Sequence, residues 1–72
     1  MERIVINSEI LAGKPVIKGT RISVEFILEM LSSGMSMKEI LKEYPHLKKE
    51  DILSSLRYAV RALKKEEVIS LQ

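Results

Sequence analysis

The chain has 72 residues, no cysteine and one histidine, His46, and its formal net charge at pH 7 is +2. This length predicts one small domain, and the composition excludes disulfides and thiolate metal sites and disfavours a histidine-based zinc site or any other cofactor. Because so small a core supplies little stability, we expect the chain to form a homodimer. We expect a cytoplasmic protein with no membrane partner, because no apolar run approaches the roughly 18 to 20 residues that cross a bilayer and no signal peptide is recognisable.

Charge is distributed unevenly along the chain. Residues 24–47 have a net charge of −2, whereas residues 48–65 carry six lysines and arginines against two acidic residues, a net charge of +4. Residues 1–23 have a net charge of +2. Such asymmetry favours a polyanionic partner more than an evenly charged surface would.

The first 23 residues are predicted to be extended. Ile4–Ile6 and Val16–Ile17 are β-branched runs, Thr20–Ile22 alternates polar and apolar residues, and glycines and a proline separate these runs as turns. Two or three short strands are not stable as an isolated ribbon. We therefore expect them to lie on the helices or to pair with the same strands of a second copy.

A helical period begins after Ser23, which is a good N-cap, and Gly34 is placed to end this first helix in the left-handed conformation. Phe26 and Met30 widen its apolar arc beyond what one core requires. A helix of this kind usually covers a second surface. The subunit contact is therefore expected to include Ile4, Ile6, Val16, Ile17, Phe26 and Met30.

A second, short helix is predicted to begin at a capping box formed by Ser36 and Glu39 and to end before Pro45. The longest helix is predicted from about Lys49 to Lys65, with residues 66–72 as a short tail. Three helices, the last long and basic, predict a single mostly α domain of helix-turn-helix type (homeodomain-like or winged-helix-like) preceded by short β-strands.

The two sides of the third helix differ in chemistry. Its aliphatic side is expected to hold the bundle together and comprises Ile52, Leu53, Leu56, Ala59, Val60 and Leu63. The opposite side is expected to face DNA, because Lys and Arg neutralise phosphates and read guanine edges while Ser and Tyr donate hydrogen bonds. The predicted DNA contacts are Lys48, Lys49, Ser54, Arg57, Tyr58, Arg61 and Lys65.

Several of these features also have purely structural explanations. The basic helix face can be a solvated surface, and Glu50 and Asp51 are best explained as complements to the helix dipole. The segment 13–21 does not match a P-loop, because Pro15 stands where a hydroxyl residue is required, although it can serve as a basic arm on a DNA backbone or a partner. His46 follows a proline in a turn with no recognisable catalytic partner, so no enzyme is expected.

The run from Gly13 to Val24, GKPVIKGTRISV, resembles the signature of the domain-of-unknown-function 433 family, and Ile40–Pro45, Leu47–Ile52 and Leu56–Ala59 match that family in order. The resemblance covers about residues 3–63. It implies a homeodomain-like DNA-binding fold, usually dimeric, of the VapB-like antitoxin kind, with a PIN-like nuclease toxin as partner. The chain departs from the family at Lys48, where a capping Thr or Ser is common, and has little chain after Leu63 to wrap a toxin.

The sequence thus predicts a dimeric DNA-binding antitoxin or transcriptional regulator of a type II toxin–antitoxin system, which represses its own promoter. Two third helices would enter successive major grooves about 34 Å apart. The alternative is a protein-interaction module that binds a PIN-like toxin or another partner without binding DNA.

Overall fold

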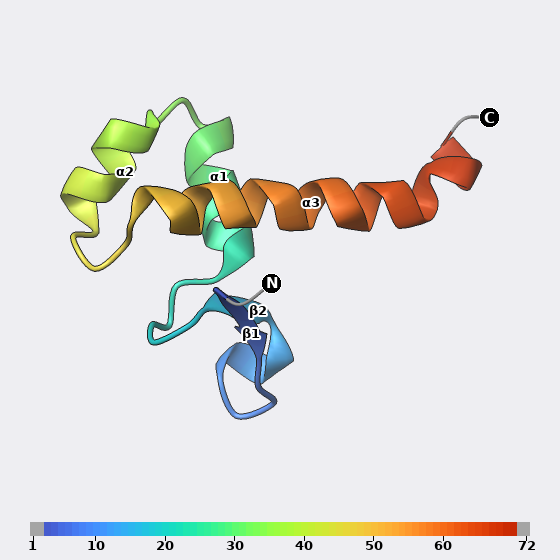
Figure 1. Cartoon of the computed structure of the whole chain (residues 1–72), viewed down its shortest axis with the longest axis horizontal. Coiled ribbons are helices and arrows are strands. Elements are labelled where there is room, and N and C mark those ends of the chain that lie inside the picture. Colours follow the sequence, from blue (N-terminus) through green and yellow to red (C-terminus); the bar gives the residue numbers. More distant parts are fainter. Residues whose placement is uncertain (1–2, 71–72) are drawn as a thin grey trace.

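The computed structural model describes residues 3–70, with side chains described through residue 65. A two-stranded hairpin precedes three helices, and the long last helix crosses the first (Figure 1). This architecture confirms the predicted mostly α fold with short N-terminal strands. In chain order the elements are β1 (Ile4–Ile6), a 3₁₀ turn (Leu11–Gly13), β2 (Pro15–Ile17), α1 (Val24–Ser32), α2 (Met37–Glu43) and α3 (Lys49–Ser70).

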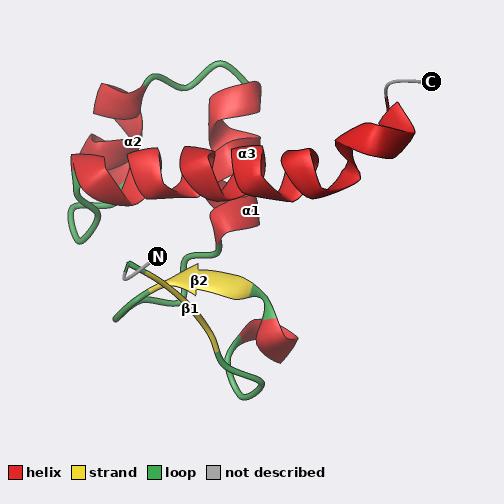
Figure 2. Ribbon diagram, turned by 45° about the vertical axis from the view of Figure 1, so that its right-hand side comes forward, coloured by secondary structure: helices red, strands yellow, loops and turns green. Residues whose placement is uncertain are grey.

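The N-terminal hairpin pairs β1 with β2 antiparallel, with Ile4 opposite Ile17. Thr20–Ile22 forms a bend and not a third strand, although an isolated antiparallel bridge joins Ser23 to Val16. The Thr20 hydroxyl donates to the Ile17 carbonyl at 2.8 Å and accepts from the Ile22 amide at 3.0 Å, which satisfies the backbone locally. The hairpin lies beneath the helices (Figure 2), so the strands pair with each other and pack on their own chain.

The ends of α1 and α2 follow the predicted local chemistry. The Ser23 hydroxyl accepts from the Phe26 amide at 2.9 Å, and Gly34, at φ 105°, ends α1 in the conformation that glycine tolerates best. At α2 the Ser36 amide donates to Glu39 Oε1 at 2.7 Å and the Glu39 amide donates to Ser36 Oγ at 3.1 Å. Both helix starts therefore lie where the sequence places them.

One hydrophobic core draws on both strands and all three helices. Ile17 of β2, Ile27 of α1, Ile40 of α2 and Ile52 of α3 are fully buried. No helix in the described part of the chain, residues 3–70, is long and apolar enough to span a bilayer.

The predicted subunit contact is largely wrong, because four of its six residues belong to the chain's own core. These four residues are Ile4, Val16, Ile17 and Met30. Ile6 and Phe26 do expose their side chains, and the Phe26 ring packs edge-on against Tyr44 with centroids 5.7 Å apart. The strands bury their apolar side under α1 and α3, which leaves little of it for a second copy.

The orientation of α3 also differs from the prediction. Its buried side chains include Asp51, Ser54 and Ser55, whereas Leu56, Val60 and Leu63 are 39, 51 and 67 % exposed. The aliphatic side therefore does not hold the bundle together, although Ile52 does lie in the core. Burying Ser55 costs little, because its hydroxyl donates to the Asp51 carbonyl of its own helix at 3.0 Å.

The third helix is also longer than predicted. It continues to Ser70 instead of ending near Lys65, so most of the predicted tail is helical. Residues 71–72 of that tail lie outside the described residues. The second half of α3 extends away from the other elements in both ribbon views (Figures 1 and 2).

Candidate nucleic-acid interface

Exposed basic side chains line one side of α3. We define the basic flank as Arg57, Arg61 and Lys64, all exposed and spaced at three and four residues, so that they lie in one row. Arg57 Nη2 lies 3.6 Å from Glu50 Oε1 and 3.5 Å from Ser54 Oγ, and both charged side chains are more than half exposed. A surface pair of this kind is weak, so Arg57 remains free to bind an anion.

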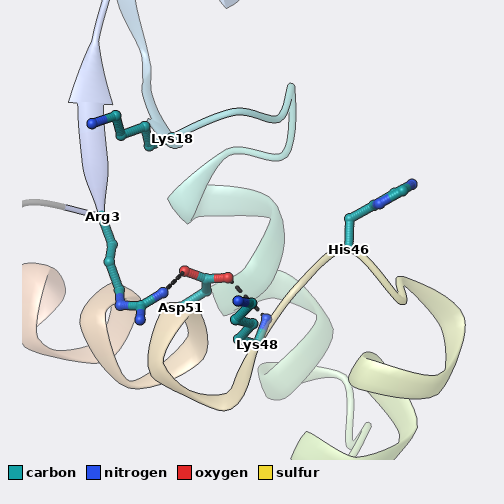
Figure 3. Close-up of a pocket in the computed structure, with 5 residues that line it drawn as sticks. All are labelled: Arg3, Lys18, His46, Lys48 and Asp51. Carbon is teal, nitrogen blue, oxygen red and sulfur yellow. Dashed lines mark hydrogen bonds and ion pairs between the residues drawn. The ribbon is translucent and has the colours of Figure 1, made fainter.

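A polar depression of about 390 Å³ lies beside the start of α3. Its lining is Arg3, Lys18, His46, Lys48 and Asp51 (Figure 3). Lys18 and His46 stand on opposite sides of it and point away from the Asp51 carboxylate, whereas Arg3 points toward that carboxylate. The depression thus combines one carboxylate with four basic side chains.

Asp51 is the central group of this depression. Its Oδ1 accepts from Arg3 Nη1 at 2.9 Å, and its Oδ2 accepts from the Lys48 backbone amide at 2.8 Å. The second bond caps α3, which explains how the helix begins at a lysine in place of the usual Thr or Ser. Because both oxygens are engaged, Asp51 opposes an incoming phosphate less than a free carboxylate would.

Of the seven predicted DNA contacts, five are exposed and two are not. Lys48 and Lys49 are exposed at the start of α3, and Arg57, Arg61 and Lys65 are exposed further along it. Tyr58 is half-buried and packs against the core. Ser54 is 6 % exposed, so the prediction that it faces outward is wrong. Ser54 faces inward because the side of α3 that carries Asp51, Ser54 and Ser55 packs against the hairpin and α1.

Sequence reasoning did not select Arg3, although it lines the depression and pairs with Asp51. The two residues are 48 positions apart, so no local spacing relates them. Lys18 belongs to the segment that was considered as a basic arm. The only sequence signal for both residues was the net positive charge of residues 1–23.

An uncovered aliphatic surface accompanies the cations. We define the aliphatic stripe as Leu56, Val60 and Leu63, which half-buried Leu53 continues toward the start of α3. At 100° per residue the stripe lies directly beside the basic flank. Exposed apolar patches that are rimmed by charge are typical of interaction surfaces.

Within the described residues, no three His, Asp or Glu side chains are grouped so that they could hold a metal ion. The same part of the chain has no buried side-chain nitrogen or oxygen that lacks a hydrogen-bond partner. Among the described residues, the exposed cations and the aliphatic stripe are thus the candidate surfaces for binding a partner.

Fold and surface together define a small three-helix domain with an N-terminal hairpin and a partly basic last helix. The family model described as "Protein of unknown function (DUF433)" matches residues 4–59, and the chain belongs to this family. A crystal structure of a DUF433 member from Anabaena variabilis superposes with a TM-score of 0.81 at 27% identity, covering 97% of this chain and 69% of the other. An uncharacterized protein from Archaeoglobus fulgidus is 64% identical over 25 residues, which are 35% of this chain and 69% of that protein.

Proposed function

We propose that this protein is a cytoplasmic transcriptional regulator of the antitoxin type, which binds double-stranded DNA as a dimer. The observation that carries the proposal is the row of exposed cations on α3, the basic flank, together with the cations at the start of the same helix. The basic flank and the lysines at the start of α3 both belong to residues 48–65, whose net charge is +4. The VapB-like, homeodomain-like character that the family resemblance implies agrees with this proposal.

DNA contact through these residues is electrostatic first. Arg57, Arg61 and Lys64 present guanidinium and ammonium groups that bind backbone phosphates and release the counterions condensed on DNA. Lys48 and Arg3 extend the positive surface to the depression. Affinity for DNA should therefore fall steeply as salt concentration rises.

An antitoxin also needs a surface for its toxin. In an unpaired chain the aliphatic stripe offers an apolar surface to the PIN-like nuclease that the family resemblance suggests, whereas in a dimer that covers the stripe the nuclease would have to bind elsewhere. This same stripe favours the second candidate function, a protein-interaction module that does not bind DNA. The two functions make different predictions for a DNA titration.

The substitution Arg61→Ala tests DNA binding. We expect weaker binding to a labelled duplex from the chain's own promoter, and a plot of log affinity against log salt whose slope is smaller by about 1, because one phosphate contact is lost. Fluorescence anisotropy at several salt concentrations measures both quantities. Lys38→Ala is the matched control, since it removes one exposed positive charge from α2.

Equal losses in the two variants would contradict a role for the basic flank and leave only a non-specific effect of net charge. If the wild-type protein shows no salt-dependent binding to the duplex, the DNA proposal is wrong. A purified PIN-like nuclease that still binds the protein would then establish the protein-interaction function.

A further inference from the structure

The aliphatic stripe is the feature that the fold leaves unexplained. In an amphipathic helix the aliphatic side normally faces the core, yet Leu56, Val60 and Leu63 become more exposed along the helix, from 39 to 67 %. The second half of α3, which includes Val60 and Leu63, leaves the body of the protein (Figure 1). An isolated helix of this length is marginal in water, so this half needs a surface to pack on.

The described elements leave the aliphatic stripe exposed to solvent. The hairpin and α1 lie on the other side of α3, where Asp51, Ser54 and Ser55 are buried. A surface other than these described elements is needed to cover the stripe.

We infer that the stripe is the contact with a second copy of this chain, whose α3 packs antiparallel to the first. The spacing of Leu53, Leu56, Val60 and Leu63 reads three, four, three, and this order is the same from either end. An antiparallel copy centred near residue 58 therefore places Leu56 against Val60 and Leu53 against Leu63. Such spacing forms a coiled-coil seam, and the contact is self-complementary about a two-fold axis.

Charge favours the same arrangement. In the antiparallel pair, Lys64 of one copy comes within about two residues, or ~3 Å along the helix axis, of the position of Glu50 in the other. Both side chains are exposed and lie on the flank of the stripe that carries Arg57. In a parallel pair Lys64 would lie far from Glu50 along the axis and this attraction would be lost.

The pairing has a consequence for the basic flank. A two-fold axis that relates two antiparallel helices returns a given flank to the same side of the pair, so both basic flanks share one face. Each copy contributes Arg57, Arg61 and Lys64 against Glu50, and the face gathers six cations and two carboxylates. The role of this face in binding DNA rests on the proposed function, whereas the pairing does not. This arrangement differs from the one predicted from the sequence, in which two separate recognition helices lie about 34 Å apart in successive major grooves.

Val60→Glu tests the pairing. A carboxylate in the seam replaces an apolar contact with a charge that must lose water on pairing, so we expect dimerisation to weaken by roughly tenfold or more. Sedimentation equilibrium should give twice the chain mass of 8.2 kDa for the wild type at micromolar concentration and the single mass for the variant. Ala62→Glu is the matched control, because it adds the same charge at an exposed position roughly 160° away around the helix and should remain dimeric.

Two results would overturn the inference: a monomeric wild type, or a Val60→Glu variant that stays dimeric with Ala62→Glu. Far-UV circular dichroism of both variants shows whether each is folded, since Val60 lies outside the core of the single chain. Binding to a nuclease with loss of self-association in the wild type would assign the stripe to a different protein and also count against the second copy.

Cysteine cross-linking tests the direction of the helices, because the natural chain has no cysteine. In the antiparallel pair residue 56 meets residue 60, so Leu56→Cys and Val60→Cys should form disulfides efficiently only when the two variants are mixed. Efficient cross-linking of each variant alone would show a parallel pair and contradict the shared basic face.

Measuring DNA affinity of the same variants separates the pairing from the proposed function. Loss of both dimer and DNA affinity in Val60→Glu, but not in Ala62→Glu, supports the shared face. Loss of the dimer with unchanged DNA affinity retains the pairing and refutes the shared face. A dimeric wild type that does not bind DNA refutes the proposed function and leaves the pairing intact.

Discussion

Asp51 is the residue that links the two parts of the fold. Its carboxylate joins Arg3, just before β1, to the start of α3 and caps that helix through the Lys48 amide. The carboxylate is buried, whereas the Arg3 side chain is 42% exposed. Solvent therefore screens the ion pair in part, and the capping bond accounts for much of what the carboxylate contributes to stability.

Replacement of this carboxylate gives a prediction at the residue scale. Asp51→Ala should lower the free energy of unfolding by about 2 kcal/mol, because it removes a helix cap and leaves the Lys48 amide without its partner. Urea denaturation at one fixed protein concentration measures this change. Glu43→Ala is the control, since it removes an exposed carboxylate from α2 and should change stability by less than about 0.5 kcal/mol.

A double-mutant cycle of Arg3→Ala with Asp51→Ala separates the ion pair from the cap. We expect the coupling between the two residues to be smaller than the total effect of Asp51→Ala. A coupling equal to that total would show that the ion pair, and not the cap, holds the start of α3.

At the scale of elements, the two shorter helices depend on their caps. The helix α2 has only seven residues, which is too short to be stable without packing, and its capping box satisfies two backbone amides that would otherwise lack partners. The helix α1 has one serine cap and a glycine end. These signals are local, which is why the sequence places both helices correctly.

Removal of the Ser36 hydroxyl tests the contribution of the α2 cap to stability. Ser36→Ala should destabilise the protein by about 1 kcal/mol, because the Glu39 amide loses its acceptor. Thermal denaturation followed by circular dichroism is a suitable measurement. Ser32→Ala provides the comparison, since its exposed hydroxyl donates to the Glu29 carbonyl within α1, and equal effects of the two substitutions would refute the capping role.

On the scale of the whole molecule, α3 has two different halves. Its first half is held by the core through Ile52 and by the hairpin through Asp51, whereas its second half extends beyond the other elements with the aliphatic stripe uncovered. A single chain therefore has a compact part and a projecting part. In the proposed dimer the projecting half of each copy packs against the first half of the other.

We expect the stability of the protein to depend on its dimerisation. If folding of α3 is completed by the second copy, the Tm of the wild type should rise by a few degrees for each tenfold increase in protein concentration. Scanning calorimetry over a range of concentrations measures this dependence. Val60→Glu should abolish it and Ala62→Glu should retain it, whereas a Tm that does not depend on concentration in the wild type would contradict the dimer.

The sequence by itself determined α1 and α2, although not the end of α3. Ser23, Gly34 and the Ser36–Glu39 box act on backbone groups within a few residues, so the boundaries of α1 and α2 follow from the chain alone. The same holds for the hairpin in outline, the mostly helical class and the cations of α3, whose exposure at Arg57, Arg61 and Lys65 was predicted.

Only the tertiary structure decided which side of α3 turns inward. Hydrophobic periodicity favoured the side of Leu56, Val60 and Leu63, but a carboxylate paired with a residue 48 positions away and two small serines occupy the buried side. Long-range pairing leaves no trace in local spacing, and so the burial of Ser54 could not be foreseen. The physical reason is that a helix with two faces able to pack is oriented by its partners, and one of those partners is a second molecule in the arrangement proposed above.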